Sequence, residues 1–247
     1  MQCTTKRTLK ISSIQLNQNN KNKYRFPESV LAVFAKEPRT GEVKTRLQPL
    51  LGAAKALALH ETLIRYVFGN LQRTSLCPAE FWVAVSPTSI DNKPHEVFLS
   101  ICNIKDIHFQ NGADLGARMQ YAVEHALRRA DSVILVGADC PSVDAAYLQQ
   151  ALTLLKSGKP VVIGPADDGG YVLLGLRRKP DQPTIDANVY DALFGAVPWG
   201  TERVVAVTRE RLAYAGIEWA ELAMRWDVDR PEDLARLATL QPPFPTL

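Results

Sequence analysis

The sequence lacks any apolar run of about 18 residues, the length that a helix needs to cross a bilayer. Its N-terminus has no apolar stretch of the kind that directs secretion. We therefore expect a cytoplasmic protein with no membrane partner. Only four cysteines and four histidines occur, without a CxxC pair or a spacing suited to zinc. Free, mostly buried thiols in a reducing compartment account for the cysteines.

The net charge of +3 is unevenly distributed along the chain. The first 28 residues contain six lysines and arginines but a single acid, Glu28, a balance of +5 that leaves −2 for residues 29–247. The basic balance therefore belongs to the leading segment, and nucleic acid is not expected as a partner. Apolar residues make up 46% and charged residues 22%, which is typical of a soluble globular protein.

Composition divides the chain into three parts. Residues 1–28 are rich in Asn, Lys, Gln and Thr, and we expect a disordered or loosely attached extension, with an edge strand at residues 9–16 as the alternative. Residues 29–240 form the predicted domain. Residues 241–247 begin Gln-Pro-Pro-Phe-Pro, which cannot continue a helix, so they are predicted to be a tail.

Within residues 29–240, short apolar runs alternate with segments whose apolar residues recur every three or four positions. This alternation predicts a three-layer α/β domain with a mostly parallel, mixed sheet. Gly169-Gly170, between two predicted strands, indicates an antiparallel hairpin. The predicted strands are at residues 29–35, 81–85, 107–109, 132–136, 160–164 and 171–176, and the predicted helices at 52–73, 115–126, 145–156, 202–213 and 231–239.

A basic loop follows the first predicted strand, and ligands of open α/β sheets bind beyond the carboxyl ends of strands. Its cations and exposed amides favour a cradle for a di- or triphosphate, although a solvated basic loop explains the charge pattern equally well. It is not a P-loop, because the required Gly before Lys44 is absent. Asp114 is a further candidate, with capping of the helix that it precedes as the alternative. The candidate nucleotide-binding residues are Ala35, Lys36, Arg39, Gly41, Lys44, Arg46 and Asp114.

Three aspartates are the candidate metal ligands. Asp139 follows the central strand, and a short, oxygen-donating side chain there suits Mg²⁺ or Mn²⁺ that bridges phosphates. Asp227 and Asp229 are two residues apart, hence on one face of an extended segment, and they could complete the metal shell. The alternative for Asp229 is a capping role, because a helix is predicted to begin at Pro231.

The segment Gly164-Pro-Ala-Asp-Asp-Gly-Gly-Tyr171 supplies candidate acceptor residues. A tight turn alone accounts for its composition. The functional interpretation is that Gly169 and Gly170 let an acceptor approach bare backbone, while Asp168 orients or activates it. Trp199 is a candidate platform for the acceptor, although a lone Trp is more often part of a core. With Asp168, the loop cations Lys44 and Arg46 are the catalytic candidates.

Six blocks in order resemble one family: AKEPRTGEVKTRL, GADLGARM, LVGADCPS, GPADDGGYVLLGL, VPWGT and WDVDRPEDL. It is the group of nucleotide-diphospho-sugar-transferase-like proteins with the GT-A fold, including members labelled arsenosugar-biosynthesis glycosyltransferases. The resemblance spans most of residues 29–238. It implies that Lys36, Lys44 and Arg46 lie in the nucleotide-phosphate loop. It also implies that Asp139 is the metal-binding acid of the fold, with Asp227 and Asp229 at its C-terminal acidic position.

A fainter similarity links Lys44-Thr-Arg-Leu47 to 2-phospholactate guanylyltransferase. Two family features are absent: the Gly-rich opening loop of many nucleotidyltransferases, and the Asp-x-Asp signature of many glycosyltransferases. Asp139 is followed by Cys140 and Pro141 instead. Both departures bear on which donor the protein uses and on how a metal ion would be coordinated.

The leading hypothesis is a metal-dependent transferase that uses a nucleotide-activated donor, with a nucleotide sugar expected. The alternatives are a nucleotidyltransferase that moves NMP from an NTP to a phosphorylated small acceptor, and a non-catalytic nucleotide-binding module. The expected partners are thus a nucleotide sugar or nucleoside triphosphate, Mg²⁺ or Mn²⁺, and a small-molecule acceptor. A homodimer is compatible with the sequence.

Overall fold

A seven-stranded sheet organises the computed structural model, which describes residues 23–86, 98 and 107–246. The strand order is β3-β2-β1-β4-β6-β5-β7, and β6 alone runs antiparallel to its neighbours within the described chain. The predicted mostly parallel, mixed sheet is therefore confirmed. The strands are β1 Ser29–Lys36, β2 Ala79–Ala84, β3 Ile107–Phe109, β4 Ser132–Gly137, β5 Val161–Pro165, β6 Tyr171–Arg177 and β7 Trp219–Glu221.

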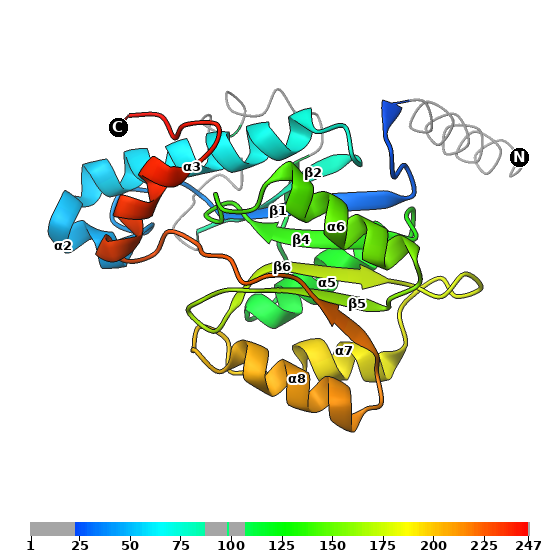
Figure 1. Ribbon diagram of the computed structural model, residues 1–247. Coiled ribbons are helices and arrows are strands. Elements are labelled where there is room, and N and C mark those ends of the chain that lie inside the picture. Colours follow the sequence, from blue (N-terminus) through cyan, green and yellow to red (C-terminus); the bar gives the residue numbers. More distant parts are fainter. Residues whose placement is uncertain (1–22, 87–97, 99–106, 247) are drawn as a thin grey trace, which may run out of the picture.

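Helices cover both faces of the sheet, so the domain has three layers (Figure 1). On one face lie α3 (Ala53–Arg73) and α6 (Ala145–Lys156). On the other face lie α5 (Leu115–Leu127), α7 (Ala187–Phe194) and α8 (Val204–Tyr214). The short elements η1 (Thr45–Leu47) and α2 (Gln48–Leu51) lead into α3, and the 3-10 helix η2 (Pro231–Thr239) follows β7.

The central strands are apolar on both faces because each face has its own core. In β1, Leu31 and Val33 pack into the core beneath α3 and α6, whereas Val30 and Ala32 pack into the core beneath α5 and α7. A strand buried on both sides needs a continuous apolar run, which is the pattern that predicted it. Aspartates begin two helices: Asp114 and Asp144 each accept a backbone N–H at 2.8 Å, which satisfies a donor that the first turn leaves free.

Some features of the fold differ from the prediction. The short elements η1, α2, α7 and β7 were not predicted, because segments of three to eight residues carry little periodicity. The last predicted helix is a 3-10 helix, in which only Leu237 is buried. Among the described residues, no helix combines the length and the apolar character needed to cross a bilayer.

At both ends, residues outside the predicted domain of 29–240 pack against it. Phe26 is buried in the core, and its N–H donates to the Leu76 carbonyl at 2.7 Å, so the domain begins before residue 28. The predicted tail packs on α3: the Tyr66 hydroxyl donates to the Pro242 carbonyl at 2.5 Å, and the Tyr66 and Phe244 rings lie 5.2 Å apart. Figure 1 shows this C-terminal segment beside α3. The alternative strand at residues 9–16 lies outside the described residues.

The β5–β6 turn is clamped against the start of α8. Gly169 has φ +89°, and a Cβ on it would lie 2.0 Å from the Glu202 carbonyl oxygen. Its own carbonyl accepts the Val205 N–H at 2.9 Å. The glycine is therefore required by close backbone packing, whatever its part in binding.

We predict that Gly169→Ala lowers the free energy of unfolding by at least about 3 kcal/mol, because Ala adds a backbone clash to the strain of a positive φ. The matched control is Gly158→Ala, at φ +104° with open space around the Cβ position, which should cost roughly 1 kcal/mol. Urea denaturation measures both. Equal losses in the two variants would contradict the proposed clash.

Candidate functional site

Three chemistry-bearing segments meet at one edge of the sheet. β1 and β4 are parallel neighbours, with Phe34 paired to Gly137, so the loop after β1 and Asp139 after β4 leave the sheet side by side. β6 runs in the opposite direction, with Leu173 paired to Val136, so its first residues lie at this same edge. The β5–β6 turn that carries Asp168 therefore joins them.

A fourth segment, residues 225–229, crosses this edge and is held there by hydrogen bonds. The Val228 N–H donates to the Asp139 carbonyl at 2.9 Å, and the Asp167 N–H donates to the Arg225 carbonyl at 3.0 Å. Asp227 is consequently fixed between the two aspartate-bearing loops. Main-chain hydrogen bonds, together with those of the Ser142 hydroxyl to Trp226, make neighbours of segments that are distant in the sequence.

The central contact is an ion pair between Lys44 and Asp139, whose Nζ and Oδ2 atoms lie 2.7 Å apart. The Lys44 side chain is 4% exposed, whereas that of Asp139 is 38% exposed, so the ammonium lies beneath a carboxylate that remains open. Burial alone would lower the pKa of Lys44, but the charge and hydrogen bond of Asp139 raise it above its usual value. Burial would raise the pKa of Asp139, and Lys44 instead holds it below its usual value. Both groups are thus ionised.

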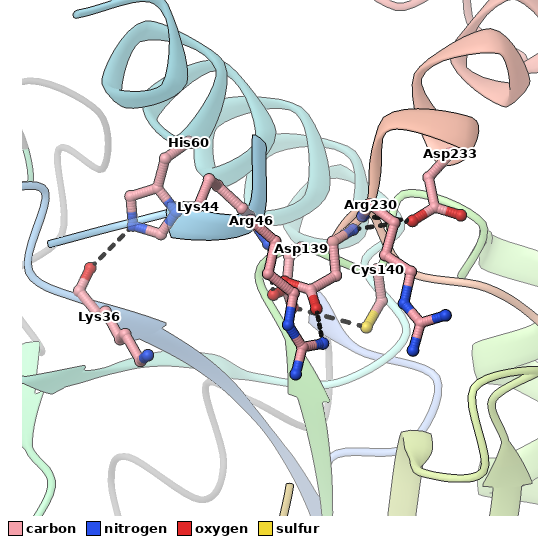
Figure 2. A network of polar contacts seen from close by, with 9 residues as sticks. Lys36, Lys44, Arg46, His60, Asp139, Cys140, Arg230 and Asp233 are labelled. Atoms are coloured by element: carbon pink, nitrogen blue, oxygen red, sulfur yellow. Dashed lines mark hydrogen bonds and ion pairs between the residues drawn. The ribbon is translucent and has the colours of Figure 1, made fainter. Parts of the chain in front are cut away.

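A second ion pair joins the same two regions nearer the surface. Arg46 donates to the Asp229 carboxylate at 2.5 Å, with side chains 58% and 34% exposed respectively. Figure 2 shows Lys44, Arg46 and Asp139 together, with Cys140 beside Asp139. The early cations and late acids that the sequence singled out therefore converge.

Asp227 forms no ion pair with any residue that the structure describes. Its pKa is raised to about 7, first by burial and then by the negative charges of Asp139 and Asp168. Four carboxylates gather here, those of Asp139, Asp168, Asp227 and Asp229, and two of them are paired with cations, Asp139 with Lys44 and Asp229 with Arg46. The excess of oxygen donors is suited to a divalent cation.

The carboxylates are gathered but do not form a closed metal cage. In the described part of the chain, no three His, Cys, Asp or Glu side chains are arranged to hold one ion. Asp139 and Asp229 each give one oxygen to a cation, which leaves each a second oxygen. Carboxylate oxygens are the ligands that Mg²⁺ and Mn²⁺ prefer, so Asp139, Asp227 and Asp229 stay candidate ligands.

The other predicted phosphate-loop residues have varied surroundings. The Lys36 side chain is exposed, and its carbonyl accepts a hydrogen bond from buried His60 at 3.0 Å. Arg39 donates to Glu37 at 3.0 Å, so its charge is already paired. Gly41 has φ +83° with open space around it, and Ala35 is buried in the core.

His60 was not singled out by sequence reasoning, although it sits on the buried stripe of α3. It anchors the end of β1 through the Lys36 carbonyl, and burial lowers its pKa, which favours the neutral ring. Cys140 is suited to packing rather than to nucleophilic attack. It is buried, and burial followed by the charge of Asp139 raises the pKa of its thiol well above the usual range.

Asp114 caps α5, and Trp199 packs against the first turn of the same helix. The Asp114 carboxylate accepts the Ala117 N–H as a helix cap, the alternative that the sequence left open. Trp199 packs on Gly116, where a Cβ would lie 2.4 Å from the indole Nε1, and its ring lies edge-on to Tyr171. Close packing of this kind is typical of a core residue rather than an open platform.

The comparisons place the chain in a family. Residues 71–201 match the model of DUF2064, described as an uncharacterized protein conserved in bacteria. The chain belongs to this family. Among curated proteins, the search finds no match.

A solved structure from Desulfovibrio desulfuricans G20, provisionally named a nucleotide-diphospho-sugar transferase, is 31% identical to this DUF2064 member. The match covers 87% of this chain and 90% of that chain, with a TM-score of 0.72. It confirms the predicted nucleotide-diphospho-sugar-transferase fold. The similarities to the arsenosugar group and to 2-phospholactate guanylyltransferase stay predictions.

Two more distant structures share the fold alone. One is CMP:2-keto-3-deoxy-manno-octonic acid synthetase complexed with CTP, at 13% identity and TM-score 0.52, over 87% of this chain and 98% of that chain. The other is a cytidylyltransferase from Leptospira borgpetersenii serovar Hardjo-bovis strain JB197, at 14% identity and TM-score 0.52, over 86% of this chain and 87% of that chain.

We predict that Lys44→Met lowers the free energy of unfolding by about 2 to 3 kcal/mol, because it leaves the Asp139 carboxylate beside other acids without its buried cation. Arg46→Met is the matched control in the same loop. It removes an exposed pair and should cost less than about 1 kcal/mol. Chemical denaturation near pH 8 compares them, and a loss for Arg46→Met as large as that for Lys44→Met would contradict the assignment.

Asp227 makes stability depend on pH. Between about pH 4 and pH 7, the folded protein holds a proton on Asp227 that the unfolded chain releases, so the free energy of unfolding falls as the pH rises through this range. Asp227→Asn removes this loss. We expect the metal-free variant to gain on the order of 2 kcal/mol at pH 8 and little at pH 4, as seen by denaturation at both values.

The control for Asp227→Asn is Asp167→Asn, which removes an ion pair to Arg236 at 2.6 Å and should bring no gain. A gain for Asp227→Asn of the same size at pH 4 and pH 8 would mean that ionisation is not its cause.

Proposed function

We propose that the protein is a metal-dependent transferase that uses a nucleotide-activated donor, and that the transferred group is a sugar. The observation that carries the proposal is the Lys44–Asp139 pair at the carboxyl edge of the sheet, flanked by Asp227 on a segment bonded to Asp139. In an open α/β sheet, this edge is where ligands bind. The name of the 31% identical relative supports the same class of donor.

The residues have distinct tasks under this proposal. Asp139 and Asp227 would hold Mg²⁺ or Mn²⁺, which neutralises the diphosphate of the donor when bound. Lys44 keeps Asp139 ionised and oriented, and exposed Lys36 and Arg46 lie in the loop that would contact phosphate oxygens. Stabilising the charge that builds on the leaving diphosphate is the main catalytic contribution.

Transfer of a sugar requires one bond to form and one to break. The acceptor hydroxyl oxygen bonds to the anomeric carbon, while the bond from that carbon to the diphosphate oxygen breaks and its electron pair leaves with the nucleoside diphosphate. The hydroxyl proton passes to Asp168 and then to water. Asp168 suits this task because the Gly170 N–H, at 2.8 Å from Oδ1, orients its carboxylate beside a cavity.

The charge of the loop favours a diphosphate over a triphosphate. Three of its cations are ion-paired: Arg39 with Glu37, Lys44 with Asp139 and Arg46 with Asp229. Among the described residues, only Lys36 of the four loop cations lacks such a partner. A donor with fewer charges, assisted by one divalent cation, matches this supply better than an NTP does.

Nucleotidyl transfer remains the second candidate because four cations lie within eleven residues of one loop, and the ion pairs of Arg39 and Arg46 are partly exposed. Release of these pairs would provide enough charge for a triphosphate. In that reaction a phosphorylated acceptor attacks the α-phosphorus and pyrophosphate leaves.

Calorimetry with UDP, GDP, CDP or dTDP tests the donor site. We expect at least one nucleoside diphosphate to bind at least tenfold more tightly with Mn²⁺ than with a chelator. Asp139→Asn should abolish this dependence, because it removes an anionic ligand. Asp144→Asn, five residues away, keeps its helix-capping role and should leave binding unchanged. Diphosphate binding that ignores both Mn²⁺ and Asp139→Asn would contradict the proposed site.

The products distinguish the two reactions. With Mn²⁺, nucleotide sugars and small hydroxylated or phosphorylated acceptors, glycosyl transfer releases a nucleoside diphosphate. Nucleotidyl transfer from an NTP releases pyrophosphate. Acceptor-dependent pyrophosphate release would overturn the sugar assignment while preserving the metal site.

A further inference from the structure

A polar cavity of about 450 Å³ lies beside the proposed donor site. Its wall comes from three separate segments: the β5–β6 turn, the start of α8 and the residue before η2. The cavity is lined by Asp167, Asp168, Gly169, Glu202, Arg203, Ala206 and Arg230.

Two arginines in this wall, Arg203 and Arg230, form no ion pair within the described part of the chain. Nearby Arg46 and Arg236 are ion-paired, with Asp229 at 2.5 Å and with Asp167 at 2.6 Å. By contrast, no carboxylate of the residues that the structure describes forms an ion pair with Arg203 or Arg230. A guanidinium is a planar fork suited to carboxylate and phosphate oxygens, and two of them line the same cavity.

Both arginines extend from fixed backbone. The Gly169 carbonyl accepts the Val205 N–H at 2.9 Å, which holds the start of α8, and Arg203 with it, against the Asp168 turn. The Arg230 N–H donates to the Asp233 carboxylate at 2.7 Å. In Figure 2 the guanidinium of Arg230 extends away from this contact. A fixed arrangement reduces the entropy that ligand binding would cost.

Three acids line the cavity, Asp167, Asp168 and Glu202, and none of them forms an ion pair with these two arginines. Asp167 is paired with Arg236, and Asp168 accepts the Gly170 N–H. Glu202 precedes α8, but the first turn of the helix contains no acid, and its N-terminal dipole adds positive potential beside Arg203. The cavity thus offers cations together with a carboxylate that can accept a hydrogen bond from a hydroxyl.

We propose that this cavity is the acceptor subsite and that the acceptor is a small hydroxylated molecule with an anionic group, a carboxylate or a phosphate, bound by Arg203 and Arg230. The hydroxyl of the acceptor lies beside Asp168. Because Asp168 interacts electrostatically with Asp227, the acceptor subsite adjoins the proposed donor site. The role as acceptor rests on the proposed function. Anion binding does not, because it needs neither metal nor nucleotide.

The test is calorimetry without metal or nucleotide, with three probes: glycerate, glycerol 3-phosphate and glycerol. We expect one or both anions to bind measurably and neutral glycerol not to bind. The stronger anion distinguishes a carboxylate from a phosphate acceptor. Arg203→Gln and Arg230→Gln should each weaken anion binding at least fivefold, since each removes one of two charged forks.

Arg209→Gln is the matched control, because Arg209 lies on α8 outside the cavity and is paired with Glu221 at 2.6 Å. It should bind the anions like the wild-type protein. Anion binding that both cavity variants retain, or no preference for anions over glycerol, would overturn the subsite. Mn²⁺-dependent diphosphate binding reports on the donor site separately, so failure of one proposal is distinguishable from failure of the other.

Discussion

The ion pair between Lys44 and Asp139 is the contact on which the site depends. It joins a loop that follows the first strand to one that follows the fourth, and it buries an ammonium under an open carboxylate. A buried cation requires an anionic partner. Lys44 therefore keeps Asp139 ionised at the point where the proposed donor would bind. In turn, the carboxylate of Asp139 allows Lys44 to stay charged although it is buried. Burial, and then the negative charges of Asp139 and Asp168, raise the pKa of Asp227 to about 7. The gathered carboxylates therefore favour a positively charged ligand.

The reversed strand β6 gives the site its second half. Because β6 runs antiparallel to β4, the β5–β6 turn returns to the edge that carries Asp139. Gly169 then allows the backbone of this turn to touch the start of α8. One glycine thereby positions Asp168 next to Arg203 and forms part of the cavity wall. The proposed donor and acceptor regions are neighbours for a topological reason, since β4 and β5 are both antiparallel to β6 and therefore end at the same edge of the sheet.

Several candidate site residues could be singled out from the sequence because their chemistry is local. Asp139 after a buried strand and the cation-rich loop after β1 are recognisable from spacing alone, and the structure brings them together. Asp114 and Trp199 show the limit of such reasoning. Helix capping and core packing use the same residue types as ligand binding. Only the contact of Asp114 with Ala117 and that of Trp199 with Gly116 distinguish these structural roles from binding. His60, Arg203 and Arg230 carry no local signal, because their significance arises from neighbours distant in sequence.

The sequence alone determined the alternation of strands and helices, and with it the three-layer α/β fold, because burial on one or both faces imposes a periodicity on the chain. It also determined which loops carry charge. Tertiary structure decided which charges meet. It paired Lys44 with Asp139 and Arg46 with Asp229, left Asp227 in an excess of acids, and lined one cavity with two arginines. It also bound Phe26 and Phe244 to the domain that composition had separated from them. Such pairings depend on distances between segments, and no local pattern of residues encodes a distance across the sheet.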